Sequence, residues 1–258
     1  MSVVSFSKDG RVGSITLTRP PVNSYEASLM GELETAIDAA LADDDVRVVV
    51  LRSGLEKFFS GGADIKAFTT TSTEDNLAMV VVAHRALSKM ADSNKVFIAA
   101  INGHALGGGM EMALACDLRF AAEGEYRMGL PEVSLGLLPG NGGTQRLPRL
   151  IGLNKALELM LFGTTVTPEE ALTLGMVNRL LPVDGFQEAI DKLAARLASG
   201  ATFAMGQIKR AAYDGFTAEL PAGLEREREL LGPLFESHDA QEGLNSFIQK
   251  RRPEFKGK

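Results

Sequence analysis

Two glutamates stand out because each begins a helical segment among apolar residues. Glu111 lies in the first turn of Met110 to Cys116, which is apolar almost all round and is therefore expected to be buried. Glu132 follows Pro131 and is surrounded by valine and leucine. A buried carboxyl group is unfavourable unless it has a partner or a task, and two of them in different environments can serve as general acid and general base. The alternative for each is an exposed glutamate that favours the positive end of a helix.

Two glycine-rich turns accompany these glutamates. The run Gly107 to Gly109 follows the strand-like segment Val96 to Ile101 and leads into the helix of Glu111. Its N–H groups are unpaired at a helix start, and glycine lets a negative oxygen approach them. A second turn, Ser60 to Ala63, also follows an apolar run and can present its last N–H group to the same point. A dinucleotide fingerprint is disfavoured, because Met112 stands where a small residue is needed.

An α/β fold must position these turns. Runs rich in β-branched residues predict strands, and apolar residues recurring every three or four positions predict helices. The predicted strands are Val3 to Phe6, Gly13 to Thr18, Val46 to Leu51, Val96 to Ile101, Leu118 to Ala121 and Asn178 to Leu181, and the predicted helices are Ala27 to Leu41, Asn76 to Met90, Met110 to Cys116, Asn154 to Leu161 and Pro168 to Leu174. Three or four more helices are expected between Phe186 and Phe247. We therefore expect an α/β core over residues 1–198 and a helical C-terminal part over residues 199–258 of the same structural unit.

Other polar residues are interpreted as structural. His84 lies on the inner side of a predicted helix, and no serine or cysteine nucleophile motif accompanies it, so a packed or boundary role is expected. Asp117 and Arg119 are expected to pair with each other. The single cysteine, Cys116, excludes a disulfide framework and a cysteine metal cluster. The basic C-terminus, Lys250 to Lys258, is either a solvated tail or an anion-binding segment.

Composition limits the possible function classes. The chain has 258 residues, of which 45% are hydrophobic and 23% charged, as in ordinary folded domains. A formal net charge of -6 argues against nucleic acid as a partner. No apolar run reaches the roughly 20 residues that cross a bilayer, and the N-terminus lacks a signal-peptide pattern. We expect a cytoplasmic protein without a membrane partner.

Four motifs in order resemble the crotonase, or enoyl-CoA hydratase, family from one end of the chain to the other. They are Phe59-Ser60-Gly61-Gly62-Ala63-Asp64-Ile65-Lys66, Asn102-Gly103-His104-Ala105-Leu106-Gly107-Gly108-Gly109-Met110-Glu111, Pro131-Glu132 with Gly136, and Leu138-Pro139-Gly140-Asn141-Gly142-Gly143-Thr144-Gln145-Arg146-Leu147. The resemblance implies a spiral of ββα units with a helical C-terminal trimerisation part. Trimers or dimers of trimers are the implied assembly.

The resemblance also implies a site for acyl-CoA thioesters. Two backbone N–H groups, those of Ala63 and Gly108, would form an oxyanion hole for the thioester oxygen. Charge that develops on this oxygen is best met by fixed dipoles, worth roughly 3 to 4 kcal/mol per donor. By analogy Glu132 would deliver a proton to the α-carbon, Glu111 would activate a water molecule, and the backbone of Gly140 would help to hold that water.

Coenzyme A itself would be part of the substrate, with no further cofactor and no metal. The resemblance places it against the turn Ser60 to Ala63, with two residues of a neighbouring subunit nearby. The implied CoA-binding residues are Gly61, Asp64, Ile65, Lys66, Phe247 and Lys250. Two segments depart from the family pattern. Lys66 to Thr71 lacks the usual glutamate after the lysine, and Pro21-Val22-Asn23-Ser24-Tyr25-Glu26 departs from the usual Leu-Asn-Ala-Leu pattern. Both departures leave the choice of acyl chain open.

Three functions remain open on the sequence. The first is an enoyl-CoA hydratase that adds water to a 2-enoyl-CoA. The second is a sister reaction at the same site, either a 3-enoyl to 2-enoyl isomerisation or a reaction of a branched, cyclic or aromatic acyl-CoA. The third is a non-catalytic acyl-CoA-binding, scaffold or RNA-binding protein, which the acidic balance and the two glutamates disfavour.

Overall fold

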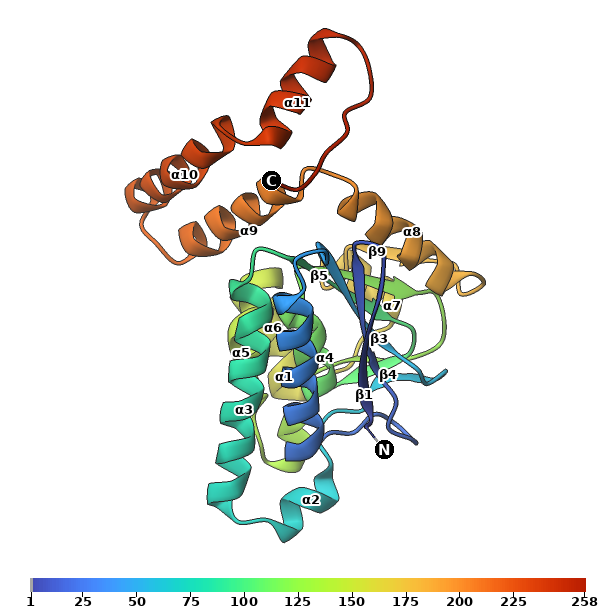
Figure 1. The fold of residues 1–258 in the computed structure, drawn as a ribbon. Coiled ribbons are helices and arrows are strands. Elements are labelled where there is room, and N and C mark those ends of the chain that lie inside the picture. The colour runs from blue at the N-terminus through green and yellow to red at the C-terminus, as the bar shows by residue number, and fades with distance from the viewer. Residues whose placement is uncertain (1) are drawn as a thin grey trace.

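The computed structural model describes residues 2–258 as a spiral of strands and helices with further helices at its C-terminal end (Figure 1). The strands are β1 Val4–Asp9, β2 Val12–Leu17, β3 Val48–Ser53, β4 Phe58–Ser60, β5 Val96–Ile101, β6 His104–Leu106, β7 Leu118–Ala122, β8 Met128–Gly129 and β9 Arg179–Leu181. The helices are α1 Ala27–Ala42, α2 Ile65–Thr70, α3 Thr73–Asp92, α4 Gly108–Ala115, α5 Gly143–Ile151, α6 Leu153–Phe162, α7 Pro168–Thr173, α8 Phe186–Ala198, α9 Thr202–Phe216, α10 Leu220–Phe235 and α11 His238–Ile248, with a 3-10 turn η1 at Glu132–Leu135.

The larger sheet has six strands in the order β1-β2-β3-β5-β7-β9. β1 and β2 form the predicted antiparallel hairpin, and each later strand runs parallel to its neighbour. On β3, Val49 and Leu51 pack in the cluster that contains the inner face of α1, whereas Val48 and Val50 pack in the cluster that contains α8. This confirms that the continuous apolar run is a strand covered on both faces.

A second sheet, of order β4-β6-β8, was not predicted. Its strands have two or three residues each, too few for a detectable alternation. The sequence predicted a turn that leads directly from β5 to a helix, but β6 lies between them. Gly103 permits this course, because a side chain there would collide with the carbonyl of Lys57. The succession of long strand, short strand and helix is the expected spiral of ββα units.

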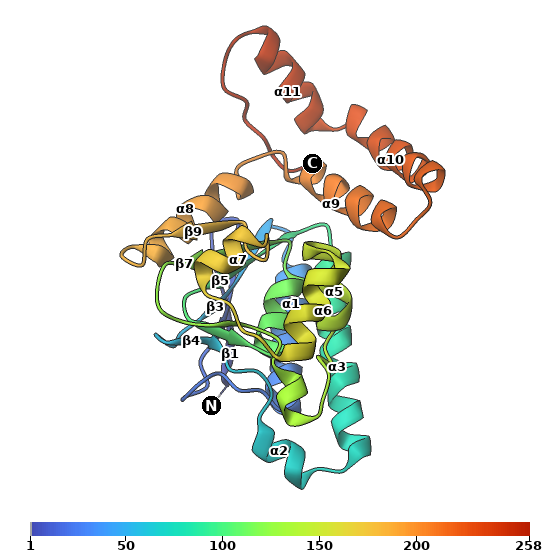
Figure 2. The same cartoon turned by 180° about the vertical axis from the view of Figure 1, so that it is seen from behind.

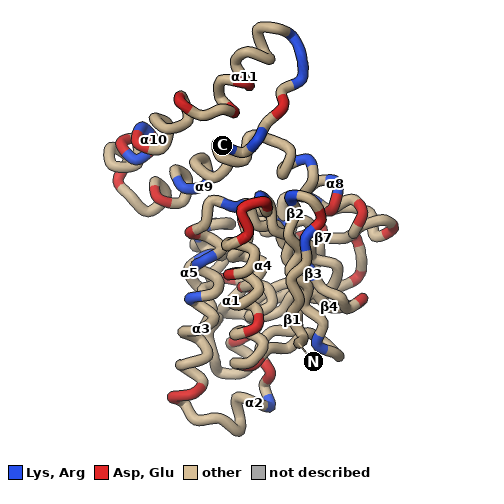
Figure 3. The backbone as a smooth tube through the Cα atoms, in the orientation of Figure 1, with Lys and Arg blue, Asp and Glu red and all other residues tan. Residues whose placement is uncertain are grey.

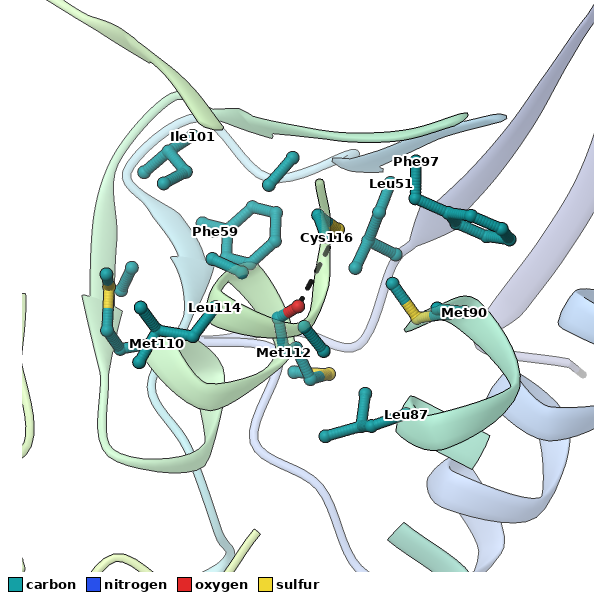
Figure 4. Close-up of a cluster of buried hydrophobic side chains, with 14 of the residues drawn as sticks. Leu51, Phe59, Leu87, Met90, Phe97, Ile101, Met110, Met112, Leu114 and Cys116 are labelled. Atoms are coloured by element: carbon teal, nitrogen blue, oxygen red, sulfur yellow. Dashed lines mark hydrogen bonds between the residues drawn. The ribbon is translucent and has the colours of Figure 1, made fainter. Parts of the chain in front are cut away.

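The central helix α4 is enclosed by the core, and all eight of its residues are buried. Figure 4 shows its side chains among residues of the surrounding strands and of α3; those labelled are Leu51, Phe59, Leu87, Met90, Phe97, Ile101, Met110, Met112, Leu114 and Cys116. The Cys116 thiol donates to the carbonyl oxygen of Met112. This packing fixes the start of α4, where the glycines and Glu111 lie.

The C-terminal helices α9, α10 and α11 project from one end of the core in both views (Figures 1 and 2). A buried ion pair holds α9 against the core, with Lys209 Nζ 2.9 Å from Asp117 Oδ2. The same ammonium donates to the carbonyl oxygens of Met90 and Lys95. The pair therefore connects α9 to the ends of three core segments.

The predicted pairing of Asp117 with Arg119 was wrong. The buried Arg119 guanidinium donates instead to the main-chain oxygens of Met176, at 2.9 Å, and Cys116, at 2.6 Å. A carboxylate and a guanidinium two residues apart face different neighbours here, because Asp117 precedes β7 and points toward α9.

The basic C-terminal segment is docked rather than free. Figure 3 shows its basic residues beyond α11, and basic and acidic residues are interspersed over the rest of the chain. Asp239 accepts hydrogen bonds from the amides of Lys256 and Gly257, both at 2.7 Å. Arg251 pairs with Glu242 on α11.

Within residues 2–258, no helix is both long and apolar enough to span a membrane.

Candidate active site

The two glycine-rich turns meet at the start of α4. Gly62 has φ +88°, and a side chain on it would lie 2.7 Å from the carbonyl oxygen of Leu106 and 3.3 Å from the amide nitrogen of Gly108. Gly107 has φ +53° and turns the chain from β6 into α4. Both positions favour glycine, because a left-handed backbone strains other residues. The contact brings the peptide of Ala63 next to that of Gly108.

The amides of Ala63 and Gly108 are both free to bind a ligand. Tyr25 forms a parallel bridge with Ala63, in which the Tyr25 amide donates to Gly62 and the Asp64 amide donates to Tyr25. Such a bridge uses the carbonyl group of Gly62 and the amide of Asp64, and it leaves the N–H group of Ala63 facing away from Tyr25. Gly108 is the first residue of α4 and has no acceptor within the helix. Over the described chain, neither amide donates a hydrogen bond.

Glu111 is buried, with 1% of its surface exposed. Its Oε1 atom accepts hydrogen bonds from the amides of Asn141 and Gly143, both at 2.7 Å. Burial raises the pKa of this carboxyl to about 7, and the charge of Glu132 adds to the rise, whereas the two amides oppose it. Glu111 is therefore held in one orientation and can exchange a proton near neutral pH.

The Glu132 carboxyl lies against the glycine turn at Gly107. A side chain on Gly107 would come within 2.9 Å of Glu132 Oε1. Among residues 2–258, the buried Oε2 atom has no hydrogen-bond partner. Burial raises the pKa of Glu132 above its ordinary value. The structure thus brings both predicted carboxyl groups to the turn that carries the Gly108 amide, with Glu111 buried and Glu132 partly buried.

The predicted water-positioning residue, Gly140, lies in the loop that also carries Asn141. Its carbonyl oxygen is 2.6 Å from His84 Nε2. Because that oxygen can only accept, the histidine donates from this nitrogen. His84 therefore supports the loop from α3. Its predicted place on the inner side of the helix was wrong, because the side chain is exposed.

Two further polar side chains at this place were not predicted. The hydroxyl of Tyr25 accepts a hydrogen bond from the Asn141 side-chain amide, and both residues are buried. The departure of the Tyr25 segment from the family pattern was the only signal in the sequence. Nothing in the sequence indicated that Asn141 would face it from a loop 116 positions away.

The predicted CoA-binding residues fall into two groups. Asp64 caps α2 through the amides of Lys66 and Ala67 and also lies 3.5 Å from Arg19, while Ile65 is 45% exposed at the start of that helix. The backbone of Gly61 pairs with Val22 through its amide. These residues surround the turn that carries the Ala63 amide.

The second group, Phe247 and Lys250, lies at the end of α11. Figures 1 and 2 place α11 and α2 at opposite ends of the molecule. One chain therefore does not bring the two groups together, and Phe247 is 85% exposed.

No cluster of three or more His, Cys, Asp or Glu side chains suited to a metal ion occurs among residues 2–258.

The fold and the paired carboxyl groups define a crotonase-type α/β protein. The sequence pattern of the enoyl-CoA hydratase/isomerase family matches residues 7–258. A Bacillus subtilis (strain 168) protein named "Probable enoyl-CoA hydratase" is 38% identical, and the 2,3-dehydroadipyl-CoA hydratase of Escherichia coli (strain K12) is 37% identical, each over 100% of both chains. An enoyl-CoA hydratase structure from Geobacillus kaustophilus HTA426 superposes with a TM-score of 0.97 at 42% identity, over 100% of this chain and 98% of that one. The chain belongs to the enoyl-CoA hydratase/isomerase family and is an enzyme.

Proposed function

We propose that this enzyme is an enoyl-CoA hydratase that adds water across the 2,3 double bond of a 2-enoyl-CoA to give a 3-hydroxyacyl-CoA. The observation that carries the proposal is the buried carboxyl of Glu111 and the partly buried carboxyl of Glu132, beside two backbone amides that donate no hydrogen bond within residues 2–258. An isolated scaffold or binding protein has no need for two acids whose pKa values are raised by burial.

In the proposed reaction the thioester oxygen binds the amides of Ala63 and Gly108. Glu111 and the backbone of Gly140 hold a water molecule, whose oxygen attacks the third carbon while a proton passes to Glu111. The double-bond electrons move toward the thioester, giving an enolate-like state that the two amides stabilise. Glu132 supplies a proton to the second carbon. Transfer of the proton from Glu111 to Glu132 restores the starting state, so the net change is the addition of one water.

The same proposal covers the substrate and the assembly. Coenzyme A binds as part of the substrate at Gly61, Asp64, Ile65 and Lys66, and the reaction requires neither a redox cofactor nor a metal. Phe247 and Lys250 contribute from a neighbouring subunit, in a homotrimer or a dimer of trimers. Exposed apolar side chains on the projecting C-terminal helices support such an assembly; they include Phe216, Leu220, Phe235, Leu244, Phe247 and Ile248.

Hydration of crotonyl-CoA tests the proposal. The absorbance of the conjugated thioester is expected to fall on mixing with the enzyme. Removal of a general acid or base typically lowers the rate by about 100-fold to 10,000-fold, so Glu111→Gln and Glu132→Gln should each show a loss of this size. Glu169→Gln, an exposed glutamate on α7, is the matched control and should keep full activity. Full activity in both active-site variants would refute the proposal.

A second candidate reaction is the isomerisation of 3-enoyl-CoA to 2-enoyl-CoA. The free Oε2 atom of Glu132 favours it, because one carboxylate beside the oxyanion amides can move a proton between two carbons. Addition of 3-hexenoyl-CoA to the Glu111→Gln variant separates the two reactions. A shifted double bond without hydration supports the isomerase, and no reaction supports the hydratase.

A further inference from the structure

The Tyr25 hydroxyl is a third polar group at the glycine turn that the proposed reaction does not yet use. Tyr25 is 3% exposed, and its oxygen accepts a hydrogen bond from the side-chain amide of Asn141. Among residues 2–258 its own hydrogen reaches no acceptor. A buried donor left without an acceptor costs about 1 to 3 kcal/mol, so an acceptor from a bound ligand is expected.

The position of the hydroxyl identifies the part of the ligand that it meets. A side chain on Gly108 would collide with the Tyr25 oxygen, so the hydroxyl lies directly against the α-carbon of the residue whose amide is free. Tyr25 lines an open cavity of about 320 Å³ together with Ala67, Phe68 and Met79. Tyr25 thus stands between this cavity and the predicted oxyanion hole.

The charge state of the phenol fits a donor. Burial is the main cause that raises the pKa of Tyr25, and the charges of Glu111 and Glu132 add to it. The hydroxyl therefore keeps its proton at neutral pH and cannot act as a base. The Asn141 amide fixes the oxygen from one side, which leaves the hydrogen free to turn toward a ligand.

We propose that Tyr25 donates a third hydrogen bond to the thioester oxygen of the bound acyl-CoA, alongside the amides of Ala63 and Gly108. This inference rests on the proposed function and goes beyond it, because leucine ends the corresponding family pattern and cannot donate. No bond is made or broken by Tyr25. It stabilises the negative charge that gathers on the oxygen.

The carbonyl stretch of a bound thioester tests this contact without catalysis. Butanoyl-CoA labelled with ¹³C at the thioester carbonyl has no double bond to hydrate, and donors on its oxygen lower the infrared frequency. The frequency is expected to be higher on Tyr25→Phe than on the wild-type enzyme. Tyr126→Phe is the matched control, because Tyr126 is also buried but donates to the carbonyl oxygen of Ala122 at 2.6 Å.

Kinetics provide the second measurement. Loss of one oxyanion donor costs about 100-fold to 1,000-fold in kcat, and a donor that supplements two others is expected to account for roughly 10-fold to 100-fold. Tyr25→Phe should lower kcat by this factor with little change in KM, and the pH profile should keep its shape. Tyr126→Phe should leave kcat unchanged.

Each outcome decides the inference. A wild-type frequency shift that persists in Tyr25→Phe overturns the role of Tyr25 and leaves the proposed function intact. The inference is also overturned if Tyr25→Phe has the same carbonyl frequency as the wild-type enzyme but a displaced pH profile of kcat, because Tyr25 would then act on Glu111. If butanoyl-CoA shows no shift on the wild-type enzyme, acyl-CoA binding at this site is refuted and the inference falls with it.

Discussion

At the scale of single residues, the Glu111 carboxyl shows how burial of an acid opposes stability. Two amide donors stabilise its ionised form, but the loss of water outweighs them and raises its pKa from 4.5 to about 7. Between these values the folded protein binds more protons at this residue than the unfolded chain does. The free energy of unfolding therefore decreases as the pH rises through this window.

Replacement of Glu111 by glutamine is expected to stabilise the protein above pH 7. A rise in pKa from 4.5 to about 7 corresponds to about 3 kcal/mol, which is the upper limit for the gain. Glutamine can still accept from the amides of Asn141 and Gly143. Urea unfolding at pH 8 and pH 4 measures the effect, which should vanish at pH 4. An equal gain at both pH values, or a gain of the same size in Glu169→Gln, contradicts the explanation.

At the scale of elements, the start of α4 depends on close contact with the end of β4. A side chain on Gly109 would collide with the backbone of Ser60, which cannot move aside easily. The helix therefore carries a residue of poor helix propensity at a position where alanine would otherwise be favoured.

Gly109→Ala is expected to be destabilising although it improves helix propensity. Overpacking of this kind typically costs about 1 to 3 kcal/mol. Gly31→Ala on α1 is the control, because nothing lies within 4 Å of its added carbon, and it should gain roughly 0.5 to 1 kcal/mol. Denaturant unfolding of both variants measures the difference. Equal effects would show that propensity, rather than the contact with β4, determines the outcome.

The sequence predicted the long elements well because each has a clear period. The hairpin, α1, α3 and the strand over Val96–Ile101 were all predicted within a few residues of their observed bounds. The short strands β4, β6 and β8 were missed, since they exist only through pairing with one another. At the site, the burial of Glu111 agrees with the prediction for its helix, whereas Glu132 is only partly buried. The contact of Tyr25 with Asn141 depends on a loop position that no local pattern encodes.

At the scale of the whole molecule, one buried ion pair connects the C-terminal helices to the core. Asp117 Oδ2 also accepts from the amide of Phe97 at 2.7 Å, and Tyr213 on α9 donates to its other oxygen at 3.1 Å. Burial raises the pKa of Asp117, whereas Lys209 opposes the rise. Without the lysine this carboxylate would be buried among neutral donors alone.

Lys209→Met is therefore expected to lower the free energy of unfolding by about 3 to 5 kcal/mol. The loss should be larger at pH 8 than at pH 5, because protonation removes the unpaired charge of Asp117 at the lower pH. Urea unfolding at both pH values measures it, and the double variant with Asp117→Asn should recover part of the loss. Lys192→Met, which breaks the exposed pair with Glu188 on α8, should change stability by less than about 1 kcal/mol. Similar losses in the two lysine variants would contradict this account.

The donors of Ala63 and Gly108 belong to the peptide chain itself. The genetic code varies side chains, so a conventional mutational scan leaves an N–H group in place at every residue except proline. At Ala63 such a scan would report packing and would miss the donor altogether. The contribution of this N–H group to the proposed reaction becomes measurable when the amide bond is replaced by an ester through chemical synthesis or semisynthesis. The ester has an oxygen in place of the N–H group and keeps the side chain.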